Sequence, residues 1–196
     1  MRDANSGSIV DQLTGEEPLY NLDPVLMYDY MNCCDRIPQI EVIEKYLILY
    51  AYAGRISNEE ADWIAKYAKK KNLKVYAIGG IQKCADRFVD CSPFEVLAYF
   101  RNAEEVITDT FHGSIFSVIT HRPFTTLIRK SVGNSYGNEE KLSDLLNRLV
   151  LTERMTTKVE DTERINQQPI DYKKVDDVLQ KQREIAKKYL QNNIEG

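Results

Sequence analysis

Both histidines of the chain lie in one short stretch, VITDTFHGSIFSVITHRPF, residues 106–124. His112 stands in a polar turn, DTFHG, between two apolar runs, and an imidazole there can act as a general acid or base near neutral pH. Taken alone, such a histidine more often fills a half-buried position without doing chemistry. His121 stands beside Arg122 and Pro123, and we predict a structural role for it.

The turn around His112 also suits an anionic ligand, because a helix is expected to begin there. The first turn of a helix presents unpaired N–H groups and the positive end of the helix dipole, which favour a phosphate or a carboxylate. Gly113 and Ser114 would let a ligand approach the backbone closely. Asp109 or Thr110 could instead cap the helix. The candidate ligand-binding residues of the turn are Asp109, Thr110, Phe111, Gly113 and Ser114.

Apolar runs alternate with amphipathic segments along the chain. Runs typical of strands buried on both faces occupy residues 46–52, 74–80, 105–109 and 124–128. Helical patterns occupy residues 57–71, 92–104, 113–120 and 138–149, and the first two open with Ser-x-x-Glu capping boxes. This rhythm predicts an α/β fold, a Rossmann-like doubly wound parallel sheet. Ligands bind such sheets beyond the carboxyl ends of the strands, where the turn at His112 is expected.

We predict a single Rossmann-like domain over residues 1–196, with its βαβ core at 46–150. A helix within residues 2–15 should end at Gly15 in the C′ position. Residues 22–30 read as an extended segment that leads toward the first strand. A polar loop at 152–170 and a long helix within 171–194 complete the chain.

The composition restricts the class of partner and the compartment. The net charge of −4 and the pI near 5.4, without a basic run among aromatics, predict no nucleic-acid partner. The longest apolar stretch, YLILYAYAG, is shorter than the roughly 20 residues that span a bilayer, and the first residues lack the apolar core of a signal peptide. We expect a cytoplasmic chain with reduced thiols, no cofactor and no metal site, since no histidine has metal-ligand spacing to Cys33, Cys34, Cys84 or Cys91.

Residues 92–124, SPFEVLAYFRNAEEVITDTFHGSIFSVITHRPF, resemble the C-terminal signature of the polysaccharide pyruvyl transferase family. That pattern is a Ser-Pro helix, a strand ending in Ser or Asp, an aromatic/Leu-His-Gly turn, a small-residue helix and a Lys/Arg-Pro-Phe step. The upstream stretches RDANS…LTG and LDPVLM resemble the segments that link the two halves of that family. The resemblance therefore covers most of residues 1–150.

The resemblance implies a transferase of surface or capsular polysaccharide synthesis. Such enzymes move the pyruvyl (carboxyethylidene) group of phosphoenolpyruvate onto two hydroxyls of a saccharide acceptor, form a cyclic ketal and release phosphate. The family resembles GT-B enzymes, with two Rossmann-like domains and an active site between them. Residues 1–45 would then lead in from a missing N-terminal domain, and this chain would be the C-terminal half, inactive in isolation.

His112 matches the histidine of the family motif and becomes the candidate catalytic residue. Protonation of the donor's methylene carbon generates an oxocarbenium-like carbon that a sugar hydroxyl attacks. The donor's anionic groups need cations, and Arg129 at the end of the fourth strand is a candidate, although a surface salt bridge explains it equally well.

The turn departs from the Asp/Ser-Arg-Leu-His arrangement of the family. Thr110 stands at the arginine position, and Phe111 replaces the leucine. The turn therefore supplies no cation for the donor. Either another basic residue takes its place, or the donor is not phosphoenolpyruvate.

Two other functions stay open. The first is the donor-binding half of a GT-B glycosyltransferase with a nucleotide sugar, in which Glu139 or Glu140 would hold the ribose, although acids in a first helical turn usually interact with the dipole. The Gly-Gly pair at 79–80 lacks the spacing of a dinucleotide fingerprint. The second is a non-enzymatic binding or assembly domain in which DTFHG only turns the chain.

Overall fold

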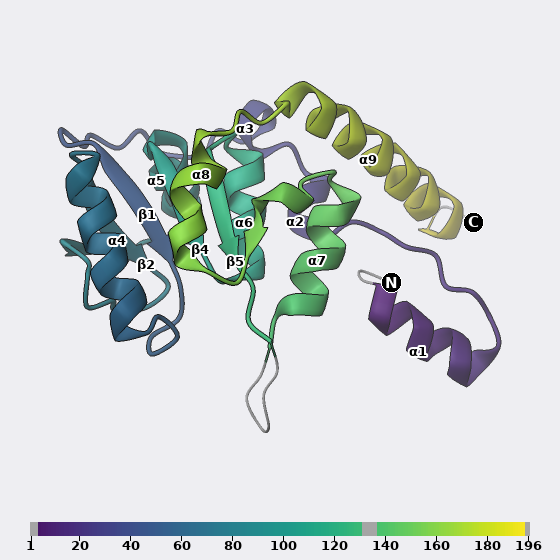
Figure 1. The fold of residues 1–196 in the computed structure, drawn as a ribbon. Helices are drawn as coiled ribbons and strands as arrows, with labels where there is room; N and C mark the ends of the chain where they lie inside the picture. The colour runs from purple at the N-terminus through teal and green to yellow at the C-terminus, as the bar shows by residue number, and fades with distance from the viewer. Residues whose placement is uncertain (1–3, 131–136, 195–196) are drawn as a thin grey trace.

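The computed structural model describes residues 4–130 and 137–194 (Figure 1). Its centre is a six-stranded sheet of order β3-β2-β1-β4-β5-β6, in which every neighbouring pair is parallel. The strands are β1 (Tyr46–Tyr50), β2 (Lys74–Ile78), β3 (Arg87–Phe88), β4 (Glu105–Thr108), β5 (Phe124–Leu127) and β6 (Met155–Thr156). The order reverses between β1 and β4, as in doubly wound folds, which confirms the predicted α/β class.

Helices cover both faces of the sheet (Figure 1). They are α1 (Ala4–Thr14), α2 (Pro24–Met27), α3 (Tyr30–Cys33), α4 (Asn58–Lys70), α5 (Pro93–Asn102), α6 (Phe111–Ile119), α7 (Glu139–Arg148), α8 (Thr162–Gln167) and α9 (Tyr172–Ile194), with short 3-10 helices η1 (Thr152–Arg154) and η2 (Val159–Asp161). In the described ranges, no helix combines the length and the apolar character that crossing a membrane requires.

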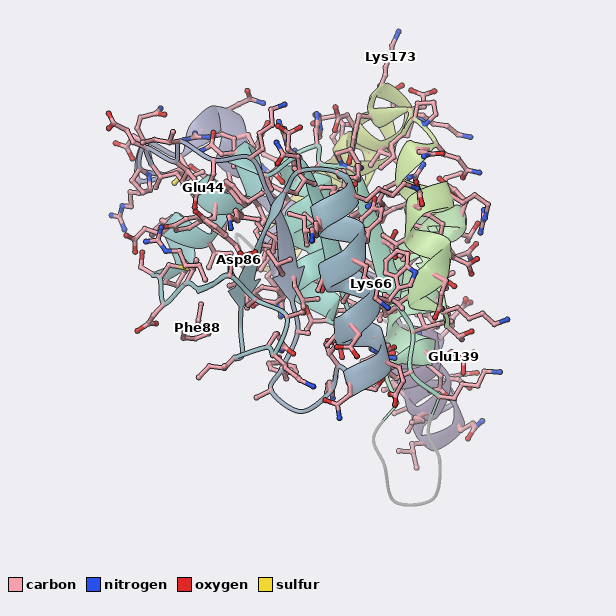
Figure 2. All side chains as sticks on the ribbon, turned by 60° about the vertical axis from the view of Figure 1, so that its left-hand side comes forward. Glu44, Lys66, Asp86, Phe88, Glu139 and Lys173 are labelled. Carbon is pink, nitrogen blue, oxygen red and sulfur yellow. The ribbon has the colours of Figure 1, made fainter. Side chains whose placement is uncertain are left out.

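Two hydrophobic cores form because alternate strand residues point to opposite faces. Leu47 and Leu49 of β1 pack with Ile64 of α4 on one face. Tyr46 and Ile48 belong to the larger core on the other face, which α5, α6, α7 and α9 also help to build. Charged side chains occupy the outer surface, and Figure 2 shows Lys66 on α4 and Lys173 projecting from the start of α9.

Local signals set the bounds of several helices as predicted. Capping boxes open α4 at Ser57 and α5 at Ser92, with both reciprocal hydrogen bonds present in each. Helix α1 ends before Gly15, whose φ of +71° suits glycine and whose N–H donates to the Asp11 carbonyl at 2.8 Å.

The segment 22–30, predicted to be extended, instead contains the short helix α2, and a second short helix, α3, begins at its last residue. Asp23 caps α2 by accepting the Val25 N–H at 3.0 Å, and Pro24 occupies the first helical position. Asp29 caps α3 in the same manner. The extended prediction was wrong because four-residue helices show no apolar period, although their caps are visible in the sequence.

The prediction of a polar loop at 152–170 was also wrong. This segment folds as η1, β6, η2 and α8, so the sheet continues beyond residue 150. Arg154 is fully buried and donates to the carbonyls of Ile165, Gln168 and Pro169 at 2.8, 2.9 and 3.3 Å. A charged residue therefore occupies a core position. Because charged residues are usually exposed, the sequence of this segment indicated a solvated loop.

Candidate functional site

The turn at His112 lies at the carboxyl end of β4, where the strand order reverses. Tyr50, the last residue of β1, pairs with Thr108, the last of β4, so the loops after both strands meet at one edge. A cavity of about 160 Å³ lies there. Its walls come from the loop after β1 (Tyr52, Arg55), the start of α6 (109–112) and the start of α7 (Asn138, Lys141, Leu142). This is the position at which doubly wound sheets bind ligands.

Larger hollows lie at the opposite, amino-terminal edge of the sheet. One of about 790 Å³ is bordered by α4 and the start of β2, and one of about 530 Å³ lies against α3 and α9. We place the candidate site in the smaller cavity because it holds the sequence-predicted turn and a buried carboxyl group without a hydrogen-bond partner in the described residues.

That carboxyl group belongs to Asp109, whose side chain is fully buried. Neither of its oxygens has a hydrogen-bond partner within residues 4–130 and 137–194. Its Oδ2 atom lies 3.9 Å from Arg55 Nη1 and 4.0 Å from Arg129 Nε. Burial raises the pKa of Asp109, and the two guanidinium groups offset only part of that rise.

The Arg129 side chain lies beside Asp109 at the edge of the site, with its Nε atom 4.0 Å from Asp109 Oδ2. Its guanidinium donates to Glu60 Oε1 at 2.6 Å and to Oε2 at 3.2 Å, while Glu60 Oε2 also accepts the Ser57 N–H in the capping box of α4. Arg129 does not line the cavity. The sequence analysis considered a salt bridge as the alternative role of Arg129, and the structure contains one, to Glu60. This salt bridge holds Arg129 beside the buried carboxyl group of Asp109.

Thr110 caps α6, since its Oγ1 accepts the Gly113 N–H at 2.9 Å. The cap starts the helix at Phe111, two residues before the predicted start, and puts His112 in the first helical turn. The His112 side chain is exposed rather than half-buried. Its imidazole lies beside the rings of Phe111 and Phe116, with centroids 5.7 and 6.0 Å away.

Gly113 and Ser114 support the turn from behind and do not line the cavity. A Cβ on Gly113 would overlap Thr108 Oγ1, so glycine is needed for α6 to pack this closely on β4. Ser114 is fully buried and bonds the Thr110 carbonyl at 3.2 Å and Thr126 Oγ1 at 2.9 Å. Both residues therefore have packing roles in this structure, and their predicted contact with a ligand stays a prediction.

The site contains residues that the sequence reasoning missed. Arg55 lies with its Cζ 5.2 Å from the centroid of the Tyr52 ring, and Lys141 enters from the first turn of α7. Asn138 does not cap α7 but joins the walls: its Nδ2 donates to the Asp109 carbonyl at 2.5 Å and its Oδ1 accepts the Arg129 N–H at 2.6 Å. Ligands bind beyond the carboxyl ends of parallel strands, and Arg55 lies in the loop that follows the strand at 46–50. The same argument that selected the turn at His112 would therefore have selected Arg55.

Over the described part of the chain, no three His, Cys, Asp or Glu side chains come together in a cluster that could hold a metal ion. The polar groups of the cavity are instead cations, one buried carboxyl group, an exposed imidazole and amide or hydroxyl groups. Such a set suits an anionic ligand and proton transfer.

The parallel, doubly wound sheet with a polar cavity at its switch point places the chain in the class of Rossmann-like α/β domains. The sequence model of the family described as polysaccharide pyruvyl transferase matches residues 19–131. That match covers more than half of the chain and includes β1 to β5 and the whole DTFHG turn. The chain belongs to the polysaccharide pyruvyl transferase family.

Comparison with solved structures adds evidence on the fold. A glycotransferase of kitacinnamycin superposes with a TM-score of 0.50 at 9% identity, over 78% of this chain and 42% of that one. A Thermobaculum terrenum O-GlcNAc transferase variant has a TM-score of 0.48 at 14% identity, over 84% and 34% of the two chains. An E. coli heptosyltransferase has a TM-score of 0.37 at 13% identity, over 70% and 50%.

These likenesses concern the fold alone. The superposition on the glycotransferase of kitacinnamycin agrees with the predicted Rossmann-like α/β fold of this chain. The chain spans half or less of the length of each of these three structures. A search of curated proteins gives no match.

Proposed function

We propose that the chain is the C-terminal, donor-binding domain of a polysaccharide pyruvyl transferase. The reaction moves the pyruvyl group of phosphoenolpyruvate onto two hydroxyls of a sugar in a surface polysaccharide. The observation that carries this proposal is the turn 109–112, which lies in the family-matched segment and lines the cavity at the switch point of the sheet. Family membership supports the transferase class and the saccharide acceptor.

The chemistry needs a group that carries protons beside the donor. One sugar hydroxyl adds to C2 of phosphoenolpyruvate while the methylene carbon C3 takes a proton. Loss of phosphate then leaves an oxocarbenium carbon, which the second hydroxyl attacks to close the ketal. Of the two hydroxyl protons, one ends on C3 and the other leaves with phosphate. We assign the proton transfer to His112, because its imidazole is exposed at the rim of the cavity.

The size of the cavity supports a small donor. Its volume of about 160 Å³ lies below the roughly 300–1,000 Å³ typical of pockets for drug-sized ligands. A nucleotide sugar would also need a carboxylate for its ribose, but neither Glu139 nor Glu140, in the first turn of α7, lines the cavity. Figure 2 labels Glu139 at the start of that helix. These features favour phosphoenolpyruvate over the glycosyltransferase alternative.

The proposal includes the domain organisation. Residues 1–45 would lead in from an N-terminal Rossmann-like domain, the sheet from β1 to β6 would form the core of this one, and the helix within 171–194 would close it. Because a site between two domains needs both, the isolated chain would have little activity. We place the reaction in the cytoplasm.

The two histidines offer a matched test. We expect His112→Ala to lower pyruvyl transfer at least tenfold, since a positioned acid or base contributes roughly 10²–10⁴-fold. His121→Ala is the control: His121 lies at the far end of α6, stacks on Tyr172 and bonds Asp176 Oδ1 at 3.0 Å. The measurement is saccharide-dependent release of phosphate from phosphoenolpyruvate by the chain joined to the protein segment encoded upstream of it.

Three outcomes would count against the proposal. Undiminished turnover in the His112→Ala variant would refute the catalytic assignment. Consumption of a nucleotide sugar in place of phosphoenolpyruvate would establish the glycosyltransferase alternative. Saccharide binding without turnover of any donor would favour a binding domain.

A further inference from the structure

The structure offers a replacement for the cation that the turn lacks. Thr110 stands where the family motif has arginine, and its hydroxyl is engaged in capping α6. Yet the cavity that contains Thr110 and His112 is also lined by Arg55 and Lys141, which come from two other elements. Two cations from outside the motif therefore line the same cavity as Thr110.

Arg55 is held on two sides beside the cavity. Its guanidinium lies over the Tyr52 ring, with Cζ 5.2 Å from the ring centroid, and Nη1 is 3.9 Å from Asp109 Oδ2. Its side chain still keeps 29% of its surface exposed. A guanidinium presents five N–H donors in a planar fork that matches a phosphate or a carboxylate. Arg55 is thus both oriented and accessible.

The electrostatics of the cavity also favour an anion. Among its described lining residues, Asp109 is the one acidic side chain, set against Arg55 and Lys141. Asp109 is itself fully buried, and its carboxyl oxygens lack hydrogen-bond partners in the described residues. The start of α6 adds the positive end of its dipole.

Arg129, the cation that the sequence suggested, is placed less well. It is bound to Glu60 through two hydrogen bonds and does not line the cavity. Its Nε atom lies 4.0 Å from Asp109, so it acts on the carboxyl group that in turn orients Arg55.

We propose that Arg55, assisted by Lys141, binds the phosphate or carboxylate of the donor, and that Asp109 positions the Arg55 guanidinium. The inference rests on the proposed function for the identity of the donor. The anion site itself follows from the residues around the cavity. The turnover assay above tests the identity of the donor, whereas the binding measurement below tests the anion site, so each can fail without the other.

Calorimetric titration of the 196-residue chain tests the anion site. Phosphoenolpyruvate, inorganic phosphate and pyruvate are the probes, each at low and at high salt. Arg55→Gln should weaken binding of phosphoenolpyruvate at least tenfold, and Arg55→Lys should weaken it less, because lysine keeps the charge but loses the fork. Lys141→Gln should have a smaller effect than Arg55→Gln. Arg164→Gln is the control, since the Arg164 side chain on α8 is 63% exposed and lies outside the cavity.

The results separate the anion site from the identity of the donor. Equal affinity of wild type and Arg55→Gln for phosphoenolpyruvate would overturn the anion site and leave the donor proposal intact. Phosphate binding that needs Arg55, without any preference for phosphoenolpyruvate, would support the site and speak against that donor. Binding of none of the three anions to the wild type would overturn the inference. Unchanged thermal unfolding of Arg55→Gln would show that lost binding is not lost folding.

Discussion

Asp109 occupies an environment that disfavours the ionised form of its carboxyl group. It is a fully buried carboxyl group without a hydrogen-bond donor in the described residues, and both nearby guanidinium groups lie about 4 Å away, at 3.9 and 4.0 Å. An ionised carboxylate in that position is costly to the folded state. Groups that reduce stability in this way are retained where activity depends on them.

We expect Asp109→Asn to raise the free energy of unfolding at pH 7 by about 1 kcal/mol, while turnover falls. Burial raises the pKa of Asp109, so the folded chain keeps this proton over a range in which the unfolded chain has lost it. Stability therefore falls as the pH rises from the ordinary carboxyl pKa through the raised one. The Asp109→Asn variant should therefore exceed the wild type in free energy of unfolding by the full amount above the raised pKa. Below the ordinary carboxyl pKa the difference should disappear.

Thermal unfolding of both chains between about pH 3.5 and pH 8 measures this effect. An asparagine variant that is less stable than the wild type at pH 7 would show that the attraction of Arg55 and Arg129 outweighs the cost of burial. Equal stability at every pH would show that Asp109 titrates as it does in the unfolded chain.

At the scale of elements, the contact between α6 and β4 sets the position of His112. Thr110 caps the helix, and Gly113 lets its first turn lie directly against Thr108. The Thr108 hydroxyl in turn donates to the Tyr50 carbonyl at 2.8 Å, which links the ends of β4 and β1. The turn that holds the imidazole is therefore part of the packed sheet rather than a surface loop.

Gly113→Ala should destabilise the chain by about 1–3 kcal/mol through overpacking. Alanine is the better helix former by roughly 1 kcal/mol, but its Cβ would overlap Thr108 Oγ1 and lie 2.8 Å from Thr108 Cβ. The buried threonine cannot move aside. Denaturant unfolding monitored by circular dichroism measures the change.

Gly7 in α1 provides the matched control for Gly113. The three atoms nearest to a Cβ there all belong to the end of the Tyr20 side chain, which is 39% exposed and can move aside. We expect Gly7→Ala to change stability by less than about 1 kcal/mol. Equal effects of the two substitutions would contradict a special packing role for Gly113.

At the scale of the whole molecule, Arg154 joins the last part of the chain to the sheet. It precedes β6 and donates to three carbonyls at the end of α8 and in the connection to α9. We expect Arg154→Met to cost about 3 kcal/mol or more, because it leaves buried carbonyls without donors. Arg164→Met, on the exposed side of α8, should stay within about 0.5 kcal/mol. Comparable losses in the two variants, measured by denaturant unfolding, would contradict this role.

The amino-acid sequence by itself determined the local elements and the position of the turn. The predicted strands at 46–52, 74–80, 105–109 and 124–128 correspond to β1, β2, β4 and β5, since buried parallel strands are continuous apolar runs. Capping residues set the starts of α4 and α5. The family pattern around His112 is equally a property of consecutive residues, and the match to residues 19–131 confirmed it.

Only the tertiary structure decided which side chains surround His112. Arg55 follows β1 and Lys141 belongs to α7, and they meet at one cavity because β1 and β4 are neighbours in the sheet and α7 begins at the same edge. Strands β3 and β6, of two residues each, are too short to show a period. Local preferences depend on neighbours in the chain, whereas a site of converging charges depends on strand order and on which carboxyl group becomes buried.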